Sequence, residues 1–180
     1  MADRTAIDTI RGYFYQFDYS IISLLKLSND TESILVEGVE DIDITTASET
    51  TAIQCKYYEK TEYNHSLIAE PIRLMLNHFK EVKLGNKAEI KYKLRGYYKS
   101  GHSKLALPLS IQNLKDNFLT YTRTEKVSNV NTKVKHFHHI ELSLSDTDLI
   151  EFIGLLEIDI NAIEFEKQFK EIIGLFKTTF

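Results

Sequence analysis

Two short segments in the first third of the chain carry the residues best suited to chemistry. Residues 37–44 read Glu-Gly-Val-Glu-Asp-Ile-Asp-Ile, and residues 53–57 read Ile-Gln-Cys-Lys-Tyr. We expect both to be strands joined by a polar turn, so that the acidic end of one lies beside the Gln-x-Lys of the other. A metal-dependent phosphodiesterase needs a carboxylate to hold a divalent cation and a lysine to position the attacking water or the phosphate. The two segments therefore indicate phosphodiester hydrolysis.

The candidate ligands of the cation follow from strand geometry. Residues two apart in a strand share a face, so Gln54 projects with Lys56, and Asp41 projects with Asp43. Mg²⁺ or Mn²⁺ prefers oxygen ligands, which the Asp41 carboxylate, the Gln54 side-chain oxygen and the Cys55 backbone carbonyl could supply. Lys56 would orient water or stabilise charge on the phosphate in the transition state. The catalytic candidates are therefore Asp41, Gln54 and Lys56.

Glutamine weakens this site, because a neutral amide binds a cation without offsetting its charge. Another acid is then required, and the nearest candidates are Glu37, Glu40 and Asp43. The sequence does not choose among them. Asp43 also competes with Asp41 for the principal role, and we favour Asp41 because its separation from Gln54 leaves room for a complete strand and turn. The alternative is a solvated strand end beside a chance Gln-x-Lys on an exposed face.

The elements that must position these residues form an α/β pattern. Strands are expected over residues 34–36, 39–44, 51–58, 88–98 and 136–143. Helices are expected over residues 6–27, from 64 or 66 to 85, around 111–118, over 145–156 and over 162–176. Residues 120–135 are polar and are expected to form a loop or an irregular hairpin. The fold predicted from this order is a mixed β-sheet flanked by α-helices.

Two of these helices have a clear apolar stripe. The first helix has its stripe at Ile10, Phe14, Phe17, Ile21 and Leu24. The last helix is expected to bury Ala162, Phe165, Phe169, Ile172 and Phe176. Spacings of three and four residues place each set on one side of a helix.

Charge is distributed unevenly along the chain. Residues 80–104 contain eight lysines and arginines against two acids, whereas residues 140–166 contain eight acids and no lysine or arginine. On the expected strand 88–98, Lys91, Lys93 and Arg95 alternate with apolar residues, so we expect them to share a face that contacts nucleic acid. The alternative is two ordinary solvated faces.

Length and composition limit the class of protein. The chain has 180 residues, 43% hydrophobic and 27% charged, which fits one globular domain with a core over about 6–110 and a helical part over about 145–180. A single cysteine excludes an internal disulfide and a cysteine-rich zinc module. No apolar run reaches the roughly 18 residues that a membrane span needs, and no signal-peptide layout is present, so we expect a cytoplasmic protein. The last helix runs almost to Phe180, which favours a natural chain that continues into another domain.

Three motifs together resemble a known nuclease core. They are Gly12-Tyr-Phe-Tyr-Gln16, Glu40-Asp41-Ile-Asp43-Ile44 and Ile53-Gln54-Cys55-Lys56-Tyr57. In order and spacing they resemble the PD-(D/E)XK nuclease superfamily in its Gln-x-Lys variant. The closer resemblance is to the nuclease domain of bacterial anti-phage effectors, above all the CD-NTase-associated endonucleases that degrade double-stranded DNA. The resemblance covers roughly the first 80 residues.

This resemblance implies a restriction-endonuclease-like fold and magnesium-dependent cleavage of DNA. It implies that Asp41 binds the metal, that Gln54 stands where a second acidic ligand usually stands, and that Lys56 is the catalytic lysine. Gln16 would be turned from the first helix toward the active site. Control by a sensor or an ATPase, as a domain or a separate subunit, and assembly into a homo-oligomer are also implied.

Other functions stay open on the sequence alone. The main rival is a nuclease-fold module that has lost activity and serves nucleic-acid binding or assembly, and a third reading is a ribonuclease. A histidine-rich stretch, His136 to His139, lacks the accompanying residues of a zinc site and is better explained by exposed strand histidines or a DNA-facing patch. No glycine-rich phosphate loop is present, which argues against nucleotide hydrolysis.

Overall fold

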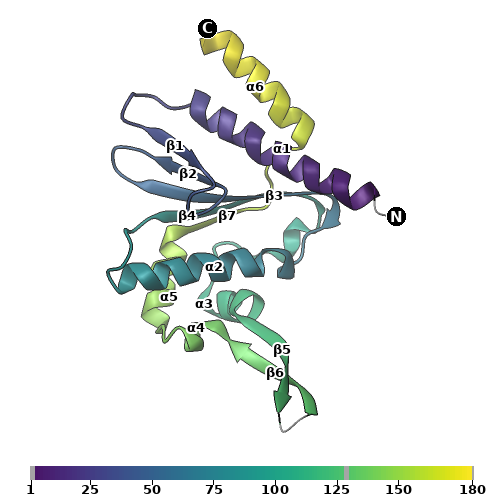
Figure 1. Ribbon diagram of the computed structural model, residues 1–180, viewed down its shortest axis with the longest axis vertical. Coiled ribbons are helices and arrows are strands. Elements are labelled where there is room, and N and C mark those ends of the chain that lie inside the picture. The colour runs from purple at the N-terminus through teal and green to yellow at the C-terminus, as the bar shows by residue number, and fades with distance from the viewer. Residues whose placement is uncertain (1–2, 128–129, 180) are drawn as a thin grey trace. The chain divides into compact units, whose positions relative to one another are not determined.

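The computed structural model describes residues 3–127 and 130–179. The helices in this part are α1 (Asp3–Leu25), α2 (Ser66–Lys83), α3 (Ile111–Leu114), α4 (His138–Glu141), α5 (Asp146–Leu155) and α6 (Phe165–Thr179). The strands are β1 (Ser33–Val36), β2 (Ile42–Thr45), β3 (Thr50–Glu62), β4 (Lys91–Ser100), β5 (Thr120–Val127), β6 (Val130–Phe137) and β7 (Leu156–Asp159). A short 3₁₀ helix spans His102–Lys104 and a π-helical turn spans Lys115–Leu119. Figure 1 shows their arrangement.

The strands confirm the predicted α/β class. Within the described residues, a five-stranded sheet has the order β1-β2-β3-β4-β7, and β5 pairs with β6 in a separate two-stranded sheet. The pairs β1/β2 and β2/β3 are antiparallel, whereas β3/β4 and β4/β7 are parallel, so the larger sheet is mixed. No helix in the described part is both long and apolar enough to cross a membrane.

The chain forms two compact units, each assembled from several stretches of sequence. The first unit comprises Met1–Tyr63, Ile90–His102 and Leu156–Phe180, and the second comprises Asn64–Glu89 and Ser103–Leu155. The expectation of one domain over the whole chain stays a prediction, because a chain that crosses repeatedly between two units can still fold as one. The five-stranded sheet, α1 and α6 belong to the first unit, and the β5–β6 hairpin belongs to the second.

The core of the first unit explains why β2 and β3 are held firmly. Ile42, Ile53 and Cys55 form a buried cluster, and Tyr19 of α1 packs against it. Consecutive residues of β3, among them Ala52 and Ile53, are buried, so both faces of the strand are covered in this stretch. The expectation that Cys55 belongs to the core is confirmed, since its side chain is buried. Burial raises the pKa of its thiol to about 12, which makes Cys55 a poor nucleophile.

Helix α1 differs from the simple reading of its apolar stripe. Ile10, Phe14 and Phe17 of the stripe are about half exposed, at 52, 54 and 52%. The opposite side of α1 is buried instead, through Tyr15 and Gln16, whose polar groups are hydrogen-bonded. Periodicity finds the apolar stripe of a helix but does not say toward which neighbour it faces.

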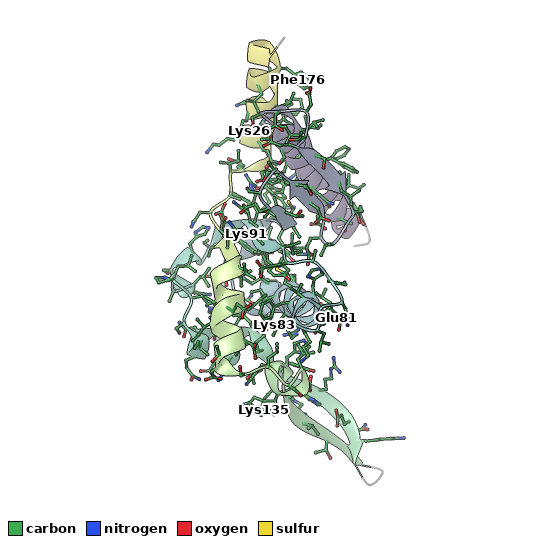
Figure 2. The ribbon with its side chains drawn as sticks, turned by 90° about the vertical axis from the view of Figure 1, so that its left-hand side faces the viewer. Lys26, Glu81, Lys83, Lys91, Lys135 and Phe176 are labelled. Carbon is green, nitrogen blue, oxygen red and sulfur yellow. The ribbon has the colours of Figure 1, made fainter. Side chains whose placement is uncertain are left out.

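The last helix shows the same difference. Helix α6 buries Ile172, but Phe169 and Phe176 of the predicted buried stripe are about half exposed. Figure 2 labels Phe176 on this helix. The side of α6 that packs on α1 includes the fully buried Gln168, whose Nε2 donates to the backbone oxygen of Tyr15 at 2.6 Å. A polar contact thus occupies a position where the pattern predicts apolar packing.

Three local expectations are also corrected. In the stretch expected to be a loop or an irregular hairpin, the described residues form the antiparallel strands β5 and β6, paired in regular register. The strand expected over 136–143 ends at Phe137, and the helix α4 follows it. Leu156 begins β7 rather than ending a helix, because its backbone pairs with Tyr92 of β4. Each difference comes from a pairing between segments that lie far apart in the sequence or from a short element that periodicity does not detect.

Candidate active site

The β2–β3 pair brings the predicted catalytic residues together. Ile42 pairs with Ile53 across the two strands, so Asp41, one residue before β2, lies opposite the next residue of β3. The Oδ2 atom of Asp41 accepts a hydrogen bond from Nε2 of Gln54 and another from the backbone N–H of Cys55 at 2.8 Å. Lys56 follows two residues after Gln54 on the same strand. Asp41, Gln54 and Lys56 therefore meet at one end of the strand pair.

Asp41 and Asp43 have different roles in the tight turn between β1 and β2. The buried carboxylate of Asp43 accepts from the backbone N–H of Val39 at 2.6 Å and of Glu40 at 3.3 Å. Because its oxygens hold the turn, Asp43 is a structural residue, and Asp41 remains as the ligand candidate. The two carboxylates, expected to project together, have different partners, since Asp41 accepts from Gln54 and Cys55 of β3 and Asp43 accepts from the turn.

Glycine is required inside this turn. A Cβ atom at Gly38 would overlap with the Asp43 carboxylate and press against the Leu35 side chain. Glu37 begins the turn with a positive φ of 60°, and its N–H donates to the Asp41 carbonyl at 3.0 Å. The Glu-Gly sequence thus supplies the tight backbone that delivers Asp41 to β3.

Helix α1 contributes Gln16 to the same turn. Gln16 is buried, and its Nε2 donates to the Glu37 carboxylate at 3.1 Å and to the Asp41 carbonyl at 3.4 Å. These contacts tie α1 to the segment that carries Asp41. They also engage Glu37, which reduces its suitability as the additional metal ligand.

The carboxylates of this region are crowded in a poorly solvated place. The pKa of Glu40 is raised to about 7, chiefly by burial and then by the negative charge of Asp41, while the nearby Lys56 ammonium opposes the shift. Burial also raises the pKa of Asp41, against the opposing effects of the Cys55 N–H, the Lys56 charge and the Gln54 amide. Two coupled acids beside one lysine leave a local excess of negative charge. A bound cation would relieve that excess.

An open pocket of about 580 Å³ gives access to these groups. Its walls come from α1 and β3, and it is lined by Thr9, Gly12, Tyr13, Gln16, Asp41, Gln54, Cys55, Lys56, Tyr57 and Tyr58. Sequence reasoning missed Thr9, Gly12 and Tyr13 as pocket residues. The motif Gly12-Tyr-Phe-Tyr-Gln16 held the signal, because helical spacing puts Thr9, Gly12 and Gln16 on one side of α1. A Cβ at Gly12 would meet open space, so the absence of a side chain at this position leaves the pocket wider.

The oxygen atoms available here fit a hard divalent cation. In the described part of the chain, no three His, Cys, Asp or Glu side chains gather closely enough to hold a metal, so amide or carbonyl oxygens must take part. The Gln54 amide turns its nitrogen to Asp41, which leaves its oxygen available for a cation. The N–H of Cys55 points to Asp41, and in a strand the carbonyl of the same residue points to the same edge. With Glu40 close by, the donor set is all oxygen, as Mg²⁺ prefers.

The residues expected to contact nucleic acid do not form an open basic surface. Lys91 pairs with Glu49 at 2.5 Å and Lys93 with Glu157 at 2.7 Å. Arg95 is buried, where its guanidinium donates to the Tyr15 hydroxyl at 2.5 Å and lies 4.3 Å from the ring centre of Tyr19. Arg95 is therefore an internal structural residue, because Tyr15 and Tyr19 of α1 cover the face of β4 from which it projects.

The histidine-rich stretch is engaged in local contacts. His136 lies 2.8 Å from both Glu125 and Glu141, and His138 lies 2.8 Å from the Asn77 side-chain oxygen. Burial lowers the pKa values of His138 and His139. These contacts indicate that His136 and His138 help to hold the β5–β6 strands in place and do not bind a metal.

Comparison with known proteins assigns no family. No family model, no curated protein and no solved structure matches this chain. The residues of the pocket and their geometry are therefore the structural features that indicate a function.

Proposed function

We propose that this protein is a metal-dependent endonuclease that hydrolyses phosphodiester bonds of DNA. One observation carries the proposal: the Asp41 carboxylate is held by Gln54 and the Cys55 N–H, beside Lys56 and Glu40, at the wall of an open pocket. This group combines oxygen ligands for a cation with a lysine for the phosphate. The resemblance of the three motifs to the PD-(D/E)XK nucleases supports the same reaction.

Each residue then has a distinct task. Asp41 and Glu40 would hold the cation with the Gln54 oxygen and the Cys55 carbonyl, and Glu40 would be the acid that offsets the neutral glutamine. Gln54 also orients Asp41 through its amide nitrogen. Lys56 would stabilise negative charge on the phosphate in the transition state. A bound Mg²⁺ or Mn²⁺ would supply Lewis acidity and lower the pKa of water.

A plasmid assay tests this proposal. Purified wild type with Mg²⁺ or Mn²⁺ should nick or linearise supercoiled DNA, and Lys56→Ala and Asp41→Ala should each abolish the activity. Lys99→Ala, at an exposed lysine of β4, is the matched control and should cleave like the wild type. RNA of similar length, given to the same preparation, distinguishes a ribonuclease. Cleavage that persists in Lys56→Ala at the wild-type rate would refute the assignment.

A second candidate is a nuclease-fold module that binds nucleic acid or assembles without cleaving. Two observations favour it: the second ligand position is the neutral Gln54, and in the described residues no three acidic, histidine or cysteine side chains form a metal cluster. This candidate is preferred if wild type binds DNA but leaves it intact with every divalent metal tested.

We further propose that the nuclease acts as an effector of bacterial anti-phage defence under the control of a sensor or an ATPase. Support comes from the motif resemblance, and from the danger that an unregulated nuclease poses to its host. The test is a phage challenge of bacteria expressing the chain in its natural gene context. Protection should be lost in Lys56→Ala, and protection that survives this change would argue against cleavage as the effector step.

The outward stripe of α1 supports a homo-oligomer formed through this helix. Its exposed residues are Ile7, Ile10, Phe14, Phe17, Ile21 and Leu24. The adjacent helix α6 also exposes apolar side chains, at Phe169, Ile173 and Phe176. The α1 spacing of three and four residues is the heptad pattern of paired helices. Such a stripe is self-complementary, because two copies of α1 can pack their apolar stripes against each other.

A second copy of the chain is the occupant that this self-complementary stripe favours. Light scattering after size exclusion should report a dimer for wild type. The double variant Phe14→Glu with Phe17→Glu should be monomeric with an unchanged circular dichroism spectrum. A monomeric wild type at concentrations of about 100 μM would contradict a dimer of useful affinity.

A further inference from the structure

The hairpin β5–β6 stands apart from the rest of the second unit. Its two strands have eight residues each, and in the described part of the chain no third strand joins them. Figure 1 shows the ribbon extending away from α2, α3 and α4 of the same unit. An isolated two-stranded ribbon has little core and is marginally stable in water. Packing within the protein therefore does not account for a protruding ribbon of this length, which suits a surface that binds a partner.

The two faces of the ribbon differ in charge. Directly opposed residues of an antiparallel pair share a face, and the pairs of one face are Thr122 with Lys135, Thr124 with Lys133, and Lys126 with Asn131. We call these six residues the basic face. All six are exposed, and the face carries three lysines and no acid. The acid of the described ribbon, Glu125, lies on the other face, 2.8 Å from His136.

The other face of the ribbon is fastened to the second unit. The Tyr121 ring stacks on His136 with ring centres 5.2 Å apart, and the Arg73 guanidinium lies 5.0 Å from the centre of the Tyr121 ring. The Tyr121 hydroxyl donates to Glu141 at 2.9 Å, and the same glutamate lies 2.8 Å from His136. These contacts from α2 and α4 fix the base of the ribbon, so that its basic face is presented outward in a defined orientation.

We propose that the basic face binds double-stranded DNA by lying in its major groove. Strands about 4.8 Å apart with a length of about 26 Å fit a groove about 12 Å wide, which admits a two-stranded ribbon. The lysines would contact phosphates on the groove walls, and the threonine and asparagine side chains would donate hydrogen bonds to phosphates or base edges. The inference goes beyond the proposed cleavage site, and it holds whether or not that site is active.

The chemistry of the face favours DNA over two other polyanions. The major groove of A-form RNA is deep and narrow, so a ribbon cannot enter it. A membrane-binding surface needs apolar anchors beside its basic residues. On the basic side of the ribbon, the register adds one exposed aromatic residue, Phe137, which lies under the Lys135 ammonium with Nζ 5.2 Å from the ring centre. One aromatic side chain engaged by a lysine is not the set of apolar anchors that a membrane surface needs. Figure 2 labels Lys135.

A binding titration tests the proposal separately from cleavage. Fluorescence anisotropy with a labelled 30-base-pair duplex is measured in EDTA, so that a failed nuclease assignment does not affect the result. The triple variant Lys126→Ala, Lys133→Ala and Lys135→Ala should bind at least about tenfold more weakly at 0.1 M salt. Its slope of log affinity against log salt should fall by up to about 2.7, because each lost phosphate contact removes about 0.9.

A charge-matched triple variant is the control. Lys87→Ala, Lys99→Ala and Lys170→Ala remove three exposed lysines outside the ribbon and should leave affinity within about twofold of wild type. If the ribbon variant melts earlier than wild type, three single Lys→Gln variants replace it, each expected to lower the slope by about one. Equal loss in both triple variants, or unchanged affinity in the ribbon variant, overturns the proposal. So does a ribbon-dependent preference for duplex RNA or for vesicles with anionic lipid.

Discussion

Two antiparallel strand pairs of this protein have similar local geometry and opposite surroundings. The pair β2–β3 lies inside a five-stranded sheet, where Asp41 and Gln54 are bonded to each other beside a buried apolar cluster. The pair β5–β6 is a separate ribbon with one fastened face and one exposed basic face. Neighbouring elements, rather than the hairpin itself, decide what each pair can do.

The difference shows that burial decides whether charged side chains bind a single cation or an extended polyanion. Beside β2–β3, burial and the negative charge of Asp41 raise the pKa of Glu40 to about 7. Two carboxylates close together in a poorly solvated place suit the binding of one small cation. On the ribbon, the lysines remain solvated, which suits contact with an extended polyanion at many weak points. We therefore expect catalysis to depend on the first pair and affinity on the second.

The largest expected effect separates these two properties directly. Lys56→Ala should lower the rate of DNA cleavage by at least about 100-fold, because it removes charge stabilisation in the transition state. Its affinity for duplex DNA in EDTA should stay within about threefold of wild type, since phosphate attraction comes from the ribbon. Single-turnover cleavage and anisotropy, measured on one preparation, check both values. An equal loss of binding and cleavage would break the comparison.

A second prediction concerns the turn that delivers Asp41. Gly38→Ala should destabilise the fold by about 1–3 kcal/mol, because the added methyl group collides with the Asp43 carboxylate that holds the turn. Gly12→Ala is the matched control: a methyl group there meets open space within a helix and should stabilise by up to about 1 kcal/mol. Urea denaturation measures both changes. Equal effects of the two substitutions would show that the turn is not rigid.

The pH dependence of stability provides a third prediction. The pKa of Glu40 in the folded protein, about 7, lies above its ordinary value of 4.5, so its contribution to stability is fully present below pH 4.5 and is lost as pH rises through 7. Glu40→Gln should therefore gain in melting temperature relative to wild type between pH 5 and pH 8. A constant difference across this range would refute the burial of Glu40.

Magnesium should extend the same experiment. If Glu40 and Asp41 hold the cation, Mg²⁺ raises the melting temperature of wild type more at pH 8 than at pH 6, because binding requires ionised carboxylates. Glu40→Gln should lose most of this rise. Calcium is a suitable control cation, since it also prefers oxygen ligands and separates binding from cleavage.

The smallest expected effect tests the paired lysines of β4. Lys91→Ala breaks an exposed ion pair with Glu49 and should change stability by less than about 1 kcal/mol. It should also change DNA affinity less than Lys133→Ala of the ribbon, although both substitutions remove one charge. Anisotropy at low salt compares the two. A larger loss in Lys91→Ala would move the DNA-binding surface back to β4.

Part of the site could be predicted because strand geometry is local. Antiparallel pairing of two adjacent segments is enough to bring Asp41 near Gln54 and Lys56, and turn residues mark the connection between them. The sequence favours Asp41 over Asp43 through spacing alone, whereas the different partners of the two carboxylates depend on backbone N–H groups of the turn, which donate to Asp43. The walls of the pocket likewise required the packing of α1 on β3.

The sequence by itself determined the α/β class, the helical and strand periodicities and the pair of segments that carry the candidate chemistry. Those properties depend on local propensity and on periods of two or 3.6 residues. Only the tertiary structure decided that Arg95 is buried, that the apolar stripe of α1 faces outward and that residues 120–127 and 130–137 form a one-sided basic ribbon. The side of a helix or strand that becomes buried depends on elements distant in the chain. The local sequence pattern does not identify those elements.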